Sequence, residues 1–150
     1  MHIRPYRPSD CQDMADLFYN TVHTVNAKDY NEDQLAAWAP GEVDIGKWDR
    51  SFRSHYTLVA TYREILLGFA DMDLKTSYLD RLYVHKDYQG QGIATTLCDS
   101  LEAAAMRPIT VHASITAKAF FEQRGYLVLK KQEVERNGLY LTNYIMQKNR

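Results

Sequence analysis

One short segment, residues 83–97, constrains the fold of this chain more than any other. An apolar run of β-prone residues, 78–84, leads into a loop that contains Gly90 and Gly92. The loop opens into apolar residues at helical spacing, which predict a helix from Ile93 onward. The start of a helix leaves three or four backbone N–H groups without helical partners, at the positive end of its dipole. Because glycine lets a ligand approach the backbone closely, this order predicts a site for a phosphate-bearing ligand.

The spacing of the glycines excludes two common phosphate-binding motifs. A Walker loop requires a Lys followed by Ser or Thr, and no such pair follows Gly90 or Gly92. A Rossmann fingerprint requires a third glycine where Thr95 stands. The segment instead resembles the Gln/Arg-x-x-Gly-x-Gly/Ala signature of the GNAT superfamily, the acetyl-CoA-dependent N-acetyltransferases. The matching residues are Gln89, Gly90, Gln91, Gly92, Ile93 and Ala94.

Residues 114–126 look like a second motif of the same family, Asn-x-x-Ala-x-x-Phe-Tyr-Glu-Lys-x-Gly-Phe. Two positions depart from it. Ser114 stands in place of the usual Asn, and Phe121 replaces a Tyr that often acts as general acid to the departing thiolate. Because both motifs occur in the family's order, the resemblance extends over roughly residues 1–147.

Composition narrows the class of protein further. The 150 residues suit a single domain, 1–150, with 18 basic and 19 acidic side chains. This near balance argues against nucleic acid or an anionic membrane as a partner. No apolar run reaches the length of a membrane span, and the N-terminus does not read as a signal peptide. Cys11 and Cys98 read as reduced thiols, so we expect a cytoplasmic protein.

The pattern of apolar residues and breakers predicts one α/β domain. Its order of elements matches that of the family it resembles, and this resemblance implies the GNAT fold, a mixed twisted sheet of about seven strands with helices on both faces. The resemblance implies a splay between the fourth and fifth strands. We expect residues 40–53 to form a long loop and Asn137-Gly138 to turn the last hairpin. The expected strands are 3–6, 56–62, 65–74, 77–84, 109–113, 126–134 and 139–146. Ser9 or Asp10 could cap the first expected helix, and Asn31 with Gln34 three residues later indicates the start of the second. The other expected helices begin at Ile93 and at Ala117, and Gly125 is expected to end the last one.

The resemblance implies how the cofactor acetyl-CoA would bind. The pantetheine arm would lie in the splay and pair with the backbone of Leu82, Tyr83 and Val84, and loop amides would hold the pyrophosphate. The N–H near Val84 would also stabilise the oxyanion. The residues implied at the loop and helices are Gln89, Gly90, Gln91, Gly92, Ile93, Ala94, Thr95, Ser114, Lys118 and Phe121.

The implied reaction is direct attack of an amine on the thioester within a ternary complex, which needs a proton acceptor. Asp80 is our first candidate, because it shares strand parity with Leu82 and Val84, and Tyr78 lies further along the same face. Asp80 could instead only pair with Arg81 or Lys86. With Phe at 121, solvent or one of several tyrosines would protonate the thiolate. These candidates are Tyr83, Tyr140 and Tyr144.

We expect the acceptor, a small-molecule or peptide amine, to bind near the first two helices, where His23, Tyr30 and Trp38 mix aromatic and polar groups. His23, His85 and His112 do not have metal-ligand spacing, so no metal is expected. Two other functions stay open: a non-catalytic CoA-binding or sensing module, and an acyltransferase that uses another acyl-CoA. The sequence does not distinguish a monomer from a homodimer.

Overall fold

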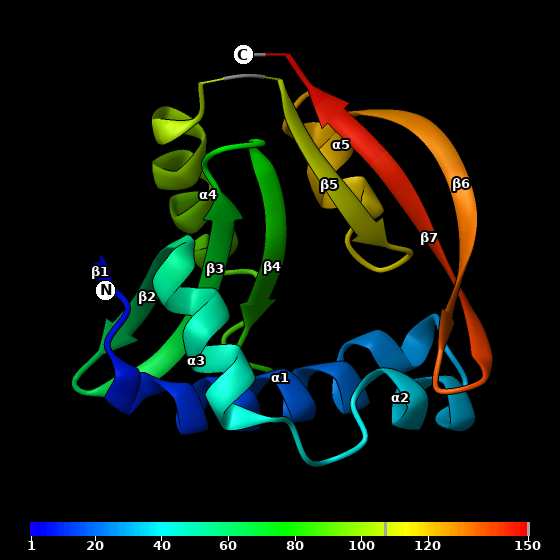
Figure 1. Ribbon diagram of the computed structural model, residues 1–150, viewed down its shortest axis with the longest axis horizontal. Coiled ribbons are helices and arrows are strands. Elements are labelled where there is room, and N and C mark those ends of the chain that lie inside the picture. Colours follow the sequence, from blue (N-terminus) through cyan, green and yellow to red (C-terminus); the bar gives the residue numbers. More distant parts are fainter. Residues whose placement is uncertain (107, 150) are drawn as a thin grey trace.

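The computed structural model describes residues 1–106 and 108–149, and these residues form a seven-stranded sheet with helices on both faces (Figure 1). The strands are β1 (His2–Pro5), β2 (Tyr56–Tyr62), β3 (Ile65–Asp73), β4 (Tyr78–Val84), β5 (Ile109–Ser114), β6 (Leu127–Arg136) and β7 (Leu139–Lys148). The helices are α1 (Cys11–Thr24), α2 (Glu32–Trp38), α3 (Ile45–Ser54), α4 (Ile93–Ala104) and α5 (Lys118–Gln123), with the short 3₁₀ turns η1 (Pro8–Asp10) and η2 (Asn26–Lys28).

The sheet has the strand order β1-β2-β3-β4-β5-β7-β6, and its one parallel pair is β4 with β5. These two strands pair only at Tyr78 with Thr110 and at Leu79 with Val111. Beyond Leu79 they diverge, so the sheet divides into a β1–β4 half and a β5–β7 half (Figure 1). The predicted mixed sheet and its splay between the fourth and fifth strands are therefore confirmed.

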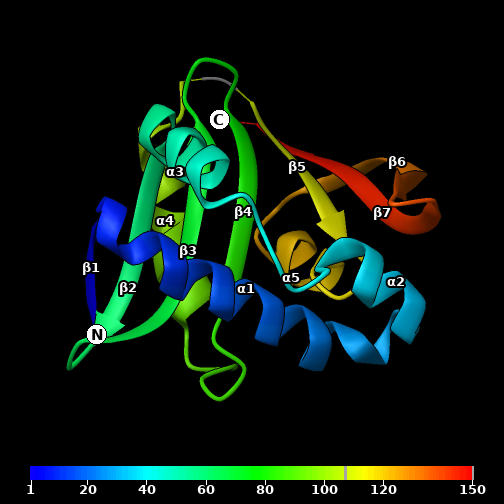
Figure 2. The same cartoon turned by 60° about the horizontal axis from the view of Figure 1, so that its bottom comes forward.

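Two hydrophobic cores cover the two faces of the sheet. On one face, Leu97 and Leu101 of α4 are fully buried against β2, β3 and β4. On the other, Met14 and Val22 of α1 are fully buried, and α3 packs beside them on β2. Figure 2 shows α1 running across the β1–β4 half toward α2. Because α1 and α4 both contact β4, they hold in place the strand that borders the splay.

The prediction of a long loop over residues 40–53 was wrong, because this stretch contains α3. The side chain of Asp44 caps the helix by accepting a hydrogen bond from the N–H of Lys47 (3.0 Å). Ile45, Trp48 and Phe52 recur at helical spacing and pack on the core that α1 covers. That spacing was the signal that the polar composition of the stretch obscured.

Several local predictions are confirmed. Asn31 and Gln34 form a capping box at the start of α2 (2.8 and 2.9 Å). Gly125 ends α5 at φ +95°, and Asn137 and Gly138 turn the last hairpin at φ +49° and +84°. The expected cap of the first helix was wrong in one respect. The carboxylate of Asp10 bonds the residues before it, Arg4 and Arg7, because η1 intervenes before α1.

None of the helices in the described part of the chain combines the length and apolar character that crossing a bilayer requires.

Candidate active site

A bulge in β4 shapes the site. β3 pairs Met72 with Leu79 and Asp71 with Arg81, so Asp80 is an extra residue with no partner on β3. Because of this insertion, Leu79 and Leu82 both pack on the α4 side of the sheet. The expected parity of Asp80 with Leu82 was therefore wrong. The bulge itself places Asp80 at the point where β4 leaves β5.

Backbone groups of β4 face the splay. The N–H of His85 donates to the carbonyl oxygen of Leu67 on β3 (2.7 Å). By alternation, the N–H and C=O groups of Leu82 and Val84 point the other way, toward β5. The Val84 carbonyl indeed accepts bonds from two side chains, Thr21 Oγ1 (3.0 Å) and Gln89 Nε2 (2.7 Å). The N–H groups of Leu82 and Val84 therefore face the gap as donors.

A cavity of about 450 Å³ follows this gap to the start of α4. Gly90 and Gly92, at φ +73° and +81°, adopt the left-handed backbone that glycine favours. No atom lies within 4 Å of the position a Cβ would take on either residue, so the loop backbone is open to a ligand. The first bond within α4 runs from the N–H of Thr96 to Gly92 (3.0 Å), which leaves the preceding helical amides as free donors.

Most of the residues implied for the cofactor line this cavity. Gln91 and Lys118 do not: Gln91 is exposed, and Lys118 lies 3.8 Å from Glu122 and over the ring of Tyr144. Those that line it are Leu82, Tyr83, Val84, Gln89, Gly90, Gly92, Ile93, Ala94, Thr95, Ser114 and Phe121. The loop, β4 and α5 thus form one continuous surface around an extended space.

A second cavity of about 240 Å³ opens beside the first, between α1, β4 and the last hairpin. Its walls are largely aromatic. It shares with the first cavity Trp38, Asp80, Arg81, Tyr83, His112 and Ser114. Two ligands, one in each cavity, would therefore meet at the bulge of β4.

Two of the three residues expected to bind the acceptor, Tyr30 and Trp38, line this second cavity. The Tyr30 hydroxyl accepts a bond from the N–H of Ile115 (2.9 Å) and donates to the carbonyl of Thr142 (2.6 Å), so it joins the region before α2 to the β5–β7 half. His23 lines neither cavity. Its Nε2 lies 2.7 Å from the carbonyl oxygen of Ala39.

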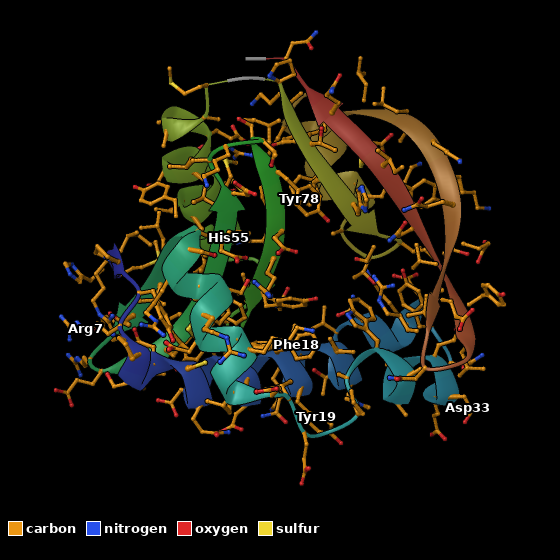
Figure 3. All side chains as sticks on the ribbon, viewed as in Figure 1. Arg7, Phe18, Tyr19, Asp33, His55 and Tyr78 are labelled. Carbon is orange, nitrogen blue, oxygen red and sulfur yellow. The ribbon has the colours of Figure 1, made fainter. Side chains whose placement is uncertain are left out.

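Beside Asp80 lies a buried ionic cluster that the sequence interpretation missed. Asp71 on β3 is fully buried, and its Oδ2 bonds both Nδ1 of His55 (2.8 Å) and Nη1 of Arg81 (2.5 Å). Figure 3 shows His55 beside β3 and β4. The groups of His55, Asp71 and Asp80 lie within 4.8 Å of one another, as in a cation site, but the Arg81 guanidinium already supplies the positive charge there. The available signal was an acidic residue, Asp71, inside an otherwise apolar strand.

Asp80 borders this cluster with 32% of its side chain exposed. Its Oδ2 lies 3.6 Å from Arg81 Nη1 and 4.0 Å from His55 Nδ1. Burial raises the pKa of Asp80, and the nearby charge of Arg81 opposes part of that rise. The hydrogen bond to Asp71 raises the pKa of His55. A carboxylate of raised pKa at the junction of two cavities is suited to accept a proton.

The candidate tyrosines occupy different environments. Tyr78 lies on β4 (Figure 3), and burial raises its pKa to about 12. The centroid of its ring is 5.2 Å from that of His112. Tyr83 lines both cavities and contacts the ring of Phe18, and burial raises its pKa also. Tyr140 is 61% exposed and lines neither cavity. Of these, Tyr83 lies at the junction of the two cavities, and Tyr78 lines the second cavity alone.

Comparison of this chain with known proteins identifies the class of enzyme to which the fold and the paired cavities belong. A family model described as the acetyltransferase (GNAT) domain matches residues 26–148. The uncharacterized N-acetyltransferase YafP of Escherichia coli (strain K12) is 33% identical over 147 residues, which are 98% of this chain and 95% of YafP. The chain therefore belongs to the GNAT acetyltransferase family and is an acyltransferase.

Solved structures agree with this assignment. A GCN5-related N-acetyltransferase from Rhodopseudomonas palustris is 38% identical, with a TM-score of 0.92 over 99% of this chain and 94% of that one. The PaiA N-acetyltransferase from Thermoplasma acidophilum, solved in complex with coenzyme A, shares the fold at 16% identity, with a TM-score of 0.78 over 99% of this chain and 98% of that one.

Proposed function

We propose that this enzyme transfers an acetyl group from acetyl-CoA to the primary amine of a small molecule or peptide, by direct attack within a ternary complex. The observation that carries the proposal is the meeting of two cavities at Asp80, beside the free donors of β4. One cavity has the open loop backbone that a pyrophosphate requires. The other has aromatic walls and a carboxylate, which suit an amine.

The residues of the first cavity fit acetyl-CoA. The loop amides and the first amides of α4 would hold the pyrophosphate, and Leu82 and Val84 would pair with the pantetheine arm as a further strand. The coenzyme A bound to PaiA supports a cofactor of this class. Acetyl-CoA would supply the activated acyl group, a thioester carbonyl. A cytoplasmic location stays a prediction, and a homodimer stays one of two open possibilities.

In this proposal Asp80 accepts the proton that the ammonium form of the acceptor must lose before it attacks. The C–N bond forms as the C–S bond breaks, and the N–H of Val84 stabilises the negative charge on the carbonyl oxygen. Phe121, 2% exposed, has no proton to give the thiolate. Water can fill this role by carrying to the thiolate the second proton, which the nitrogen loses after it attacks. A thiol pKa of about 8.5 makes the thiolate a tolerable leaving group.

Titration calorimetry and a transfer assay test the proposal together. Acetyl-CoA, CoA and desulfo-CoA should each bind with micromolar affinity, and a panel of primary amines should yield CoA thiol together with an acetylated product identified by mass. Other acyl-CoA donors, competed against acetyl-CoA, would reveal a different acyl preference. Absence of binding would overturn the cofactor site. Binding without transfer to any amine would favour the CoA-sensing alternative and count against the proposed reaction.

A further inference from the structure

We propose that the acceptor amine also carries a carboxylate, which Arg136 binds at the end of the second cavity away from the cofactor. The inference rests on the proposed function, because it names the class of acceptor for the same site. It follows from how the positive charges that face this cavity are balanced.

Two guanidinium groups line the second cavity, and their surroundings differ. Arg81 is neutralised by Asp71 and stacks over the rings of Trp48 and Phe52 (5.2 and 4.8 Å). Arg136, on β6, donates only to the carbonyl oxygen of the preceding residue (3.0 Å) and forms no ion pair with any carboxylate in the described part of the chain. Arg136 is exposed to solvent where it lines the cavity, so one positive charge at the rim of the cavity has no counter-charge from the described residues.

The rings of Tyr78 and His112 lie near enough to both Arg136 and Asp80 to feel the charge of each. Both rings line the cavity, with centroids 5.2 Å apart. The negative charge of Asp80 raises the pKa of both rings, and the positive charge of Arg136 lowers it. Burial lowers the pKa of His112, and the positive charge of Arg136 lowers it further. This imidazole therefore stays neutral and adds no second charge. The cavity is therefore lined by a negative group, a positive group and a neutral aromatic pair that lies near both.

A ligand with an ammonium and a carboxylate complements this arrangement. The ammonium would lie at Asp80, where transfer occurs, and the carboxylate at Arg136, whose planar fork suits two-point binding of a carboxylate. Phe18, Trp38 and Leu141 offer apolar surface for the carbon skeleton. At about 240 Å³ the cavity lies below the roughly 300 Å³ of drug-sized pockets, which indicates a small acceptor.

One buried polar atom adds to the argument. Asn143 lines the second cavity, and its Oδ1 is buried with no hydrogen-bond partner in the described residues. A small acceptor with a further N–H or O–H donor would satisfy it. A polyamine, by contrast, would bring a second ammonium toward Arg136, and the like charges would repel. The geometry thus favours an amino acid over a polycation.

The test compares matched acceptors. The panel holds α- to δ-amino acids, each with its carboxamide and with the plain amine that lacks the carboxyl group. Arg136→Gln should lower kcat/KM for the acids about 10- to 100-fold, the range expected for a lost bond to a charged group, and leave the amides and amines unchanged. Arg136→Lys should lower kcat/KM for the acids by a smaller factor, because lysine keeps the positive charge. Lys131→Gln, on the same strand but the opposite face, should change none of them.

Calorimetric titration of the same acids into protein saturated with desulfo-CoA gives a readout that needs no turnover. Binding that Arg136→Gln weakens, without any acetyl transfer, would support this inference and overturn the proposed function. Transfer to plain amines and amides as fast as to the acids, with no effect of Arg136→Gln, would overturn the inference and leave the acetyltransferase function intact. Binding of none of the acids would overturn the inference as well.

Discussion

At the scale of single residues, the chemistry of the site depends on charges held beside a bulge. Asp80 lies at the junction of the two cavities because β4 has one residue more than β3 at this point. Asp71, fully buried, holds Arg81 and His55 around it. The bulge thus supplies position, and the ionic cluster supplies the electrostatic environment in which Asp80 titrates.

Replacing Asp80 should separate catalysis from cofactor binding. Asp80→Asn removes the proton acceptor, so kcat should fall about 100-fold or more, while calorimetry should show unchanged affinity for acetyl-CoA. In the wild-type enzyme kcat should rise with pH through the raised pKa of Asp80, because the carboxylate must be ionised to act. Asp13→Asn, an exposed position on α1, should leave both quantities unchanged. Equal kcat values for Asp80→Asn and wild type would place the proton acceptor elsewhere.

The His55–Asp71 pair should make stability depend on pH. A histidine whose pKa is raised in the folded protein stabilises the fold while it is protonated. This contribution is complete below about pH 6.5, the ordinary histidine pKa, and is lost as pH rises through the raised value. His55→Gln should therefore lower the free energy of unfolding more near about pH 6 than near about pH 9, as urea unfolding would measure. Exposed His2→Gln should show no such difference, and an equal loss at both pH values for His55→Gln would contradict the argument.

At the scale of elements, the site depends on how strands end and helices begin. β4 ends in a loop whose glycines leave the backbone open, and α4 begins there with free amides. The region before α2 is tied to the other half of the sheet through the hydroxyl of Tyr30. Each connection can be tested by one substitution with a matched control.

Gly92→Glu should abolish binding of acetyl-CoA. The substitution places a side chain and a negative charge in the space where the pyrophosphate would lie. It also strains the backbone at φ +81°, so the control must carry the same strain. Gly138→Glu does so, at φ +84° with open space around it in the last hairpin, and calorimetry should show unchanged binding. Undiminished affinity of Gly92→Glu for acetyl-CoA would mean that the loop is only a turn.

Tyr30→Phe should lower the free energy of unfolding by about 1–3 kcal/mol, because it leaves the N–H of Ile115 and the carbonyl of Thr142 without their partner. Urea unfolding monitored by tryptophan fluorescence would measure this. Tyr19→Phe, at a ring that is 39% exposed, should cost less than about 0.5 kcal/mol. A loss no larger for Tyr30→Phe than for Tyr19→Phe would show that the Tyr30 link contributes little.

At the scale of the whole molecule, the two half-sheets are joined in the described structure by two residue pairs between β4 and β5. The first cavity runs along this division, and residues of both halves line it: Leu82 and Val84 from β4, and Ala113 and Ser114 from β5. A ligand there would contact both halves and stabilise the folded enzyme.

Acetyl-CoA should therefore raise the melting temperature of the wild-type protein. At a free concentration of 100 times Kd, a ligand that binds only the folded state adds about 2.7 kcal/mol of stability. The shift should follow the cofactor concentration in differential scanning fluorimetry and should vanish in Gly92→Glu. If acetyl-CoA changed the melting temperature of neither the wild type nor Gly138→Glu, that result would count against a binding site between the two halves.

The features that could be predicted from the sequence are those with local causes. The turn at Asn137-Gly138, the capping box at Asn31 and the glycine loop before α4 each depend on the conformational preferences of a few neighbouring residues. The order of these elements and the two motifs also indicated the family. For α3 the local signal was present, in the spacing of Ile45, Trp48 and Phe52, but the polar residues between them suggested a loop.

Only the tertiary structure decided what lies next to Asp80. The bulge that turns it toward both cavities arises from the pairing of β4 with β3, which strand alternation in one sequence does not show. His55, Asp71 and Arg81 are brought together by burial and charge pairing across three elements, and Arg136 reaches the second cavity from a hairpin more than fifty residues away. Backbone preferences act over a few residues, whereas the arrangement of charges around a site depends on contacts that form only when distant segments pack.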